Sequence, residues 1–109
     1  MTRLFGAIPA NEAGWPSVVP FTATLTAATT TYTVLSTDYT VNCSSVSAFE
    51  VTLLTAVGRS GQIFNIKNSG VGIVMLATTS SQTIDGQASG EITLTQYDCL
   101  TVQSDGTNW

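Results

Sequence analysis

The fold prediction starts from residues 61–86, which read GQIFNIKNSGVGIVMLATTSSQTIDG. Two runs in this stretch, residues 62–67 and 73–77, are rich in residue types that favour β-strands. The connection between them, residues 68–72, includes asparagine and glycine, which adopt positive φ at low cost and therefore suit a chain reversal. A connection of this length predicts a β-hairpin with a longer loop or a bulge.

Further short runs of alternating polar and apolar residues lie on both sides of this stretch. Their period of two is that of half-buried strands, and Gly, Asn and Asp residues separate them, as in Asp85-Gly86. We expect seven or eight short strands, almost no helix and no long internal repeat, which indicates a small β-sandwich or barrel. The additional runs are residues 32–34, 39–43, 49–53, 91–95 and 99–103.

Residues 1–20 differ from the rest of the chain. Three prolines there exclude a long helix or a central strand, yet the segment is too apolar for a solvated linker. We predict an extended N-terminal arm, residues 1–20, that binds a partner, and a β-sandwich module, residues 21–109. An irregular segment folded back on its own module is the alternative. The predicted contact residues are Arg3, Leu4, Phe5, Ile8, Trp15 and Phe21.

Composition excludes several classes of protein. Only 9% of the residues are charged and the net charge is −4, whereas the chain holds 19 Thr and 11 Ser. Hydroxyl-rich, weakly charged strands suit a protein that buries much of its surface in an assembly. The three cationic residues are scattered, so we expect no nucleic-acid binding. No apolar run approaches the roughly 20 residues that a membrane-spanning helix requires, so we expect no membrane span, and we expect no signal peptide.

The chain has two cysteines, Cys43 and Cys99, and no histidine. The sequence is compatible with one disulfide and equally with two free thiols. Because Cys-x-x-Cys pairs and histidine are absent, we expect no zinc site, and we expect no other metal and no cofactor.

Carboxylates are the remaining candidates for catalysis. Asp85, Glu91 and Asp98 could in principle supply an acid–base pair. However, Asp85 and Asp98 occupy turn contexts, in which Asp accepts backbone hydrogen bonds, and Glu91 belongs to an alternating run. Without histidine no Ser-His-Asp or Cys-His arrangement exists. We therefore predict that the chain is not an enzyme.

From residue 32 onward, six short motifs follow one another: Tyr32-x-Val34, Asp38 to Cys43, Val51-x-Leu53, Gly61 to Asn68, Ile84-Asp85-Gly86, and Tyr97 with Leu100-x-Val102 and Ser104 to Trp109. Their order resembles that of the small β modules of tailed-bacteriophage virion appendages. These appendages include tail fibres, spikes, head fibres and capsid decoration proteins. Each motif is ordinary by itself, and the resemblance rests on their order over some seven-tenths of the chain.

The resemblance implies an all-β, jelly-roll-like sandwich that forms a homotrimer and serves the virion without catalysis. Two departures stand out. The family often has Leu-Pro where this chain has Leu53-Leu54, and its members usually continue through one more strand after the position of Trp109. A neighbouring subunit could complete that last edge, or the edge could simply be left short.

Among virion roles, a short arm joined to a small module is typical of a capsid decoration (cement) protein. The expected partners are the chain itself, as a homotrimer, and the major capsid protein. The expected location is the capsid surface of the virion, after assembly in the host cytoplasm. The arm residues would grip the capsid.

Two other functions remain open at this stage. A fibre or spike module would bind host glycans through residues 44–47, 68–72 and 78–81, and a secreted carbohydrate-binding module would be unrelated to phage. The aromatic residues that could stack on sugars are Tyr39, Tyr97 and Trp109, although packing in the core or at an interface suits each of them better. A subunit interface could use Ile73 with Met75 or Ile92 with Leu94, although both pairs suit the core equally well.

Overall fold

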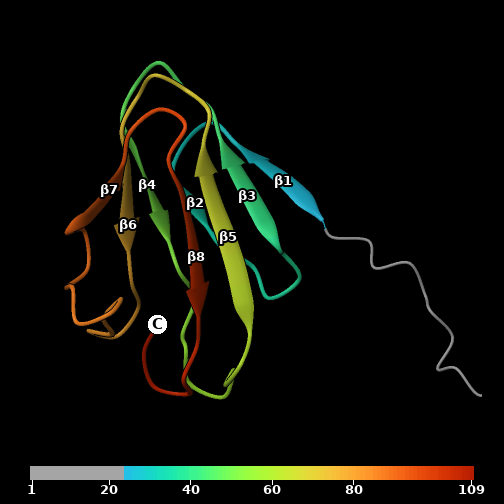
Figure 1. Cartoon of the computed structure of the whole chain (residues 1–109), viewed down its shortest axis with the longest axis vertical. Coiled ribbons are helices and arrows are strands. Elements are labelled where there is room, and N and C mark those ends of the chain that lie inside the picture. Colours follow the sequence, from blue (N-terminus) through green and yellow to red (C-terminus); the bar gives the residue numbers. More distant parts are fainter. Residues whose placement is uncertain (1–23) are drawn as a thin grey trace, which may run out of the picture.

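The computed structural model describes residues 24–109, which form two four-stranded β-sheets packed face to face (Figure 1). No helix occurs in this range. The predicted all-β sandwich is confirmed, and so are its eight short strands. They are β1 (Leu25–Ala28), β2 (Tyr32–Thr33), β3 (Thr40–Cys43), β4 (Phe49–Thr52), β5 (Ile63–Asn68), β6 (Val74–Ala77), β7 (Ile92–Leu94) and β8 (Cys99–Gln103).

Strands β1 to β6 alternate between the two sheets, so this part of the chain winds as a flattened coil. One sheet has the order β1-β3-β5-β8 and the other β2-β4-β6-β7. The first three strands of each sheet are parallel. Val41 pairs with Ile66 and Val51 with Leu76, so the second turn of the coil takes up the same length of sequence in both sheets. This structural repeat was not expected from the sequence.

The last two strands reverse the direction of the coil. β7 lies antiparallel to β6, and β8 lies antiparallel to β5. Four of the six strand pairings in the described range are therefore parallel. Jelly rolls belong to the antiparallel architectures, so this strand pairing differs from the one that the resemblance implies.

The predicted hairpin is wrong. β5 and β6 lie in different sheets, and residues 69–73 cross from one sheet to the other as an arch (Figure 1). Phe64 and Ile66 from β5 and Val74 and Leu76 from β6 are all fully buried. The two strands thus face each other across the core with their side chains. Their backbone hydrogen bonds go to other strands.

The glycines of this arch are required by close packing. Neither Gly70 nor Gly72 has positive φ, and Asn68 lies within β5, contrary to the prediction that such residues reverse the chain. A Cβ atom on Gly70 would overlap the backbone of Ser45, and one on Gly72 would overlap the backbone of Ser47. The two arches can approach this closely because these positions lack side chains.

The core lies between the sheets and closes around Phe64. Trp109 packs its ring against that of Phe64 in an edge-to-face arrangement, with 5.5 Å between ring centroids. The indole Nε1–H of Trp109 donates to the carbonyl oxygen of Leu54 at 3.2 Å. Leu94 is buried in the same cluster and Ile92 packs against it. The predicted interface pair Ile92 and Leu94 therefore belongs to the core, whereas Ile73 of the other predicted pair is exposed.

Both cysteines are free thiols. Cys43 is buried in β3, and Cys99 is exposed on β8, with β5 between the two strands. Burial raises the pKa of the Cys43 thiol to about 11, which keeps it protonated at neutral pH. The sequence left open a disulfide or two free thiols, and the structure has the two free thiols.

We expect Gly72→Ala to lower the free energy of unfolding by about 3 kcal/mol, because the added methyl group forces apart two arches with fixed backbones. Urea unfolding would measure the loss. Val71→Ala, an exposed change on the same arch, should stay within about 0.5 kcal/mol of the parent. Equal stabilities for the two variants would contradict the packing argument.

Candidate interaction surfaces

Four connections between the sheets stack at one end of the sandwich, at the top of Figure 1. Residues 29–31, 44–48, 69–73 and 95–98 form these arches. Backbone hydrogen bonds join neighbouring arches, as from Gly72 N–H to the Ser45 carbonyl oxygen at 2.8 Å. The glycan-contact prediction included two of them, and the third predicted loop, residues 78–81, follows β6 at the other end of the strands.

A buried amide side chain holds the third and fourth arches together. The Asn68 Nδ2 group donates to the carbonyl oxygens of Gly72, at 2.8 Å, and Leu94, at 2.9 Å. Its Oδ1 atom accepts from Gly70 N–H at 3.0 Å. The Asn68 backbone also bonds both ways with the fourth arch, to the Asp98 carbonyl oxygen and from Tyr97 N–H. Sequence reasoning missed this role.

Large apolar side chains project from the tips of three adjacent arches. We call Val46, Val71 and Tyr97 the arch-tip residues; their exposed fractions are 85%, 63% and 71%. Val46 and Val71 occupy equivalent positions of successive turns, since the register that pairs Val41 with Ile66 also matches Val46 to Val71. Tyr97 has a φ of 71°, which is a strained conformation for a bulky residue and is common at functional positions. These features mark this end as a candidate docking surface.

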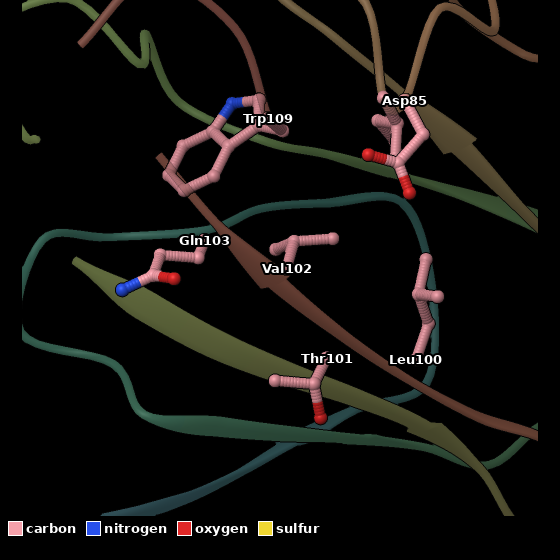
Figure 2. Close-up of a pocket in the computed structure, with 7 residues that line it drawn as sticks. Asp85, Leu100, Thr101, Val102, Gln103 and Trp109 are labelled. Carbon is pink, nitrogen blue, oxygen red and sulfur yellow. The ribbon is translucent and has the colours of Figure 1, made fainter. Parts of the chain in front are cut away.

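A cleft of about 310 Å³ lies beside β8 (Figure 2). Four consecutive β8 residues line it, and Ile84, Asp85 and Trp109 form the remaining wall. Asp85 has a φ of 48° in the turn that Ile84 and Gln87 close, as predicted for Asp85-Gly86. The β8 residues are Leu100, Thr101, Val102 and Gln103.

Asp98 and Asp105 have lowered pKa values because their carboxylates accept hydrogen bonds from nearby backbone N–H groups. Asp98 accepts from the N–H and the hydroxyl of Thr95, at 2.9 and 2.8 Å, and these bonds lower its pKa. Asp105 accepts from Asn108 N–H and Thr107 N–H, with the same effect on its pKa. Asp98 therefore has the turn role that the sequence predicted.

Asp38 links the first turn of the coil to the second. Its carboxylate accepts from the hydroxyls of Tyr32, at 2.6 Å, and Thr26, at 2.7 Å, and from Leu35 N–H at 2.8 Å. Burial by itself would raise the pKa of Asp38, but these three bonds together lower it below its usual value. Burial, and then the bond to Asp38, raise the pKa of Tyr32 to about 12.

The aromatic, acidic and arm residues that the sequence singled out do not come together in one site within the described residues. Trp109 is buried in the core and Tyr97 is exposed on an arch tip. Asp85 lies in the turn beside the cleft, where its N–H bonds to the Trp109 carbonyl oxygen, whereas Asp98 lies in the arch before β8 and accepts from Thr95, so each serves a separate turn. The predicted arm residues Arg3, Leu4, Phe5, Ile8, Trp15 and Phe21 lie outside the described residues.

Within residues 24–109, no three His, Cys, Asp or Glu side chains come together as metal ligands. The same range contains no helix that is long and apolar enough to cross a bilayer. Comparisons of the chain with protein-family models, with curated proteins and with solved structures found no match.

Removal of the Asn68 amide should be costly. Asn68→Ala leaves Gly70 N–H and the carbonyl oxygens of Gly72 and Leu94 without their partner, and we expect a loss of about 3 kcal/mol or more in unfolding free energy. Asn65→Ala, on the same strand but only half-buried, should cost about 1 kcal/mol in the same urea titration. A smaller loss for Asn68 than for Asn65 would refute the assigned role.

The Tyr32–Asp38 pair should make stability depend on pH at both extremes. The lowered pKa of Asp38 gives stability that is lost as the pH falls below its usual value of 3.8. The raised pKa of Tyr32 gives stability that is lost between pH 10 and about 12. Urea midpoints measured from strongly acidic to strongly alkaline pH would follow both losses. Tyr32→Phe should weaken the acid loss and reduce the alkaline one, of which the raised pKa of Cys43 accounts for the remainder. An unchanged alkaline loss would exclude this origin.

Proposed function

We propose that the chain is a capsid decoration (cement) protein of a tailed-bacteriophage virion, which binds as a homotrimer to the outer surface of the capsid and stabilises it. The observation that supports docking is the exposure of Val46, Val71 and Tyr97 on adjacent arches at one end of the module. The phage assignment rests on the resemblance in motif order. In this proposal the trimer assembles in the host cytoplasm and contacts the major capsid protein.

The arches suit docking because their backbones are already ordered. Hydrogen bonds between arches, and the Asn68 amide beneath them, hold the tips before any partner binds. Binding then costs little backbone entropy. A well-packed apolar anchor contributes about 2 kcal/mol, so three tips per subunit form a useful surface.

The arm extends this contact in the proposal. Leu4, Phe5 and Trp15 are apolar residues of the kind that anchor interfaces. Three arms on one trimer bind with higher avidity than one arm alone. Because such a trimer binds the assembled shell and not its unfolded subunits, its binding free energy adds to the stability of the shell. No reaction is assigned to the chain.

A glycan-binding fibre or spike module is the second candidate. It is favoured by Tyr97, whose exposed side chain shares its arch with Gln96, and the Gln96 amide donates to the Ser69 carbonyl oxygen of the neighbouring arch at 3.4 Å. An exposed aromatic face beside polar groups suits a sugar ring. Glycan binding that depends on Tyr97 would favour this candidate over the decoration role.

The proposal predicts a solution mass of about three times the 11.4 kDa subunit and co-sedimentation with shells of the phage that encodes the chain. The double variant Val46→Ser/Val71→Ser should bind the shells at least tenfold more weakly, because two apolar anchors are lost. Light scattering and a sedimentation assay measure these two quantities.

Val57→Ser provides the matched control, since Val57 is also exposed but lies in the connection after β4, away from the arch tips. It should bind shells like the parent. A trimer that ignores shells and leaves their melting temperature unchanged would refute the decoration role, and a monomer would refute the trimer.

A further inference from the structure

β8 is a free edge of its sheet within the described part of the chain. It pairs with β5 on one side, and no strand pairs with its other side. Ser104 N–H bonds to the Gln62 carbonyl oxygen and Asn68 N–H to that of Asp98. Because bonded and non-bonded pairs alternate in an antiparallel ladder, the backbone groups of Cys99, Thr101 and Gln103 point to the free side.

The cleft in Figure 2 runs along this free edge. Side chains of consecutive strand residues point to opposite faces, so a cleft lined by four consecutive β8 residues must follow the strand. Leu100 in this strand is only partly buried although it packs on the core. An added strand would cover Leu100 and satisfy the backbone groups of the free side at once.

We propose that residues 3–8 from a second copy of this chain add to β8 as a fifth strand, so that the arm of one subunit binds the module of another. Residues 1–23 precede the described range. Among these, residues 3–8 read Arg-Leu-Phe-Gly-Ala-Ile, are similar to β8 in length and are followed by Pro9, which ends pairing.

Charge favours residues 3–8 over residues 10–15, the other proline-free run of similar length in the arm. Asp85 lines the cleft, and Arg3 brings a positive charge to it. Residues 10–15 carry Glu12, which would be repelled. Leu4 and Ile8 fall on the same face of such a strand, and this face suits the side that covers Leu100.

The topology favours a second copy over the chain's own arm. The arm joins the module at β1, the opposite edge of this sheet from β8. To return to its own β8, the arm would cross the outer face of the sheet, where Thr40, Asn65 and Lys67 offer little apolar cover for Trp15. Residues 9–24 can span roughly 50 Å at about 3.3 Å each, which is enough to reach a neighbour.

Such an exchange is heterologous, because the arm of each subunit meets the β8 edge of the next. Heterologous contacts close into rings when the rotation allows, so this exchange can produce a closed trimer. The inference concerns the isolated protein and assigns residues 3–8 to the neighbouring subunit, so that Trp15 is the apolar anchor that the arm keeps for a shell. Its test therefore uses no capsid.

The test uses the exposed thiol of Cys99. One chain, labelled with ¹⁵N, carries Cys99→Ser and a single new cysteine at position 4, 5, 6, 7 or 8; the other chain has the parent sequence. After the two are refolded together and mildly oxidised, non-reducing mass spectrometry measures the disulfide between labelled and unlabelled chains. We expect efficiency to alternate along the five positions, because alternate residues of a strand face Cys99.

A blocked edge provides the matched control. Thr101→Pro in the unlabelled chain removes an N–H on the free side, a position where edge strands tolerate proline, and should reduce the crosslink at least tenfold. Ala27→Pro makes the same change on the free side of β1 and should leave the crosslink unchanged. The carbonyl oxygens of Thr24 and Ala28 bond to β3, so in the alternating strand the backbone N–H of Ala27 points away from β3.

Three results would overturn the proposal. They are an absent or non-alternating crosslink, a crosslink that survives Thr101→Pro, and a disulfide within one chain when the arm cysteine and Cys99 are combined in it. The last result would place the arm on its own module.

Discussion

The buried amide of Asn68 is the interaction on which the stacked end of the sandwich depends. Its three hydrogen bonds connect the arch of residues 69–73 to β7 and fix the two glycines that let this arch approach its neighbour. A side chain without both donor and acceptor groups could not satisfy these backbone groups away from water. The arch-tip residues stand on this base, so the same amide that stabilises the fold also positions the proposed docking surface.

Strand positions could be predicted from the sequence, whereas strand pairing could not. Alternation shows which side of a strand is apolar, but a hairpin and an arch both place two apolar faces on one core. One distinguishing signal is present: the spacing from Val41 to Val51 equals that from Ile66 to Leu76. A parallel pairing partner one full turn of the coil away has no local sequence mark. The glycines of the arch resemble turn formers in the sequence because the residues they pack against, Ser45 and Ser47, are one full turn of the coil away in sequence.

The candidate surfaces were predictable to a similar degree. Asp85 and Asp98 have the turn positions that their neighbours in sequence indicate, and two of the three predicted loops meet at the arch end. The cleft beside β8 was missed because Trp109 joins Ile84 and Leu100 there only after folding. The arm contacts stay a prediction, since those residues lie outside the described range.

The position of Trp109 gives the chain an internal optical probe. The chain has two tryptophans, and Trp109 is the one within the described residues, packed on Phe64 with its indole N–H bonded to Leu54. Its backbone also bonds to Thr83 and Asp85, so its emission reports the strand ends and the core together. With Trp15 replaced by Phe, the tryptophan fluorescence of the chain would come from this buried ring alone, and loss of the core could be followed without any attached dye.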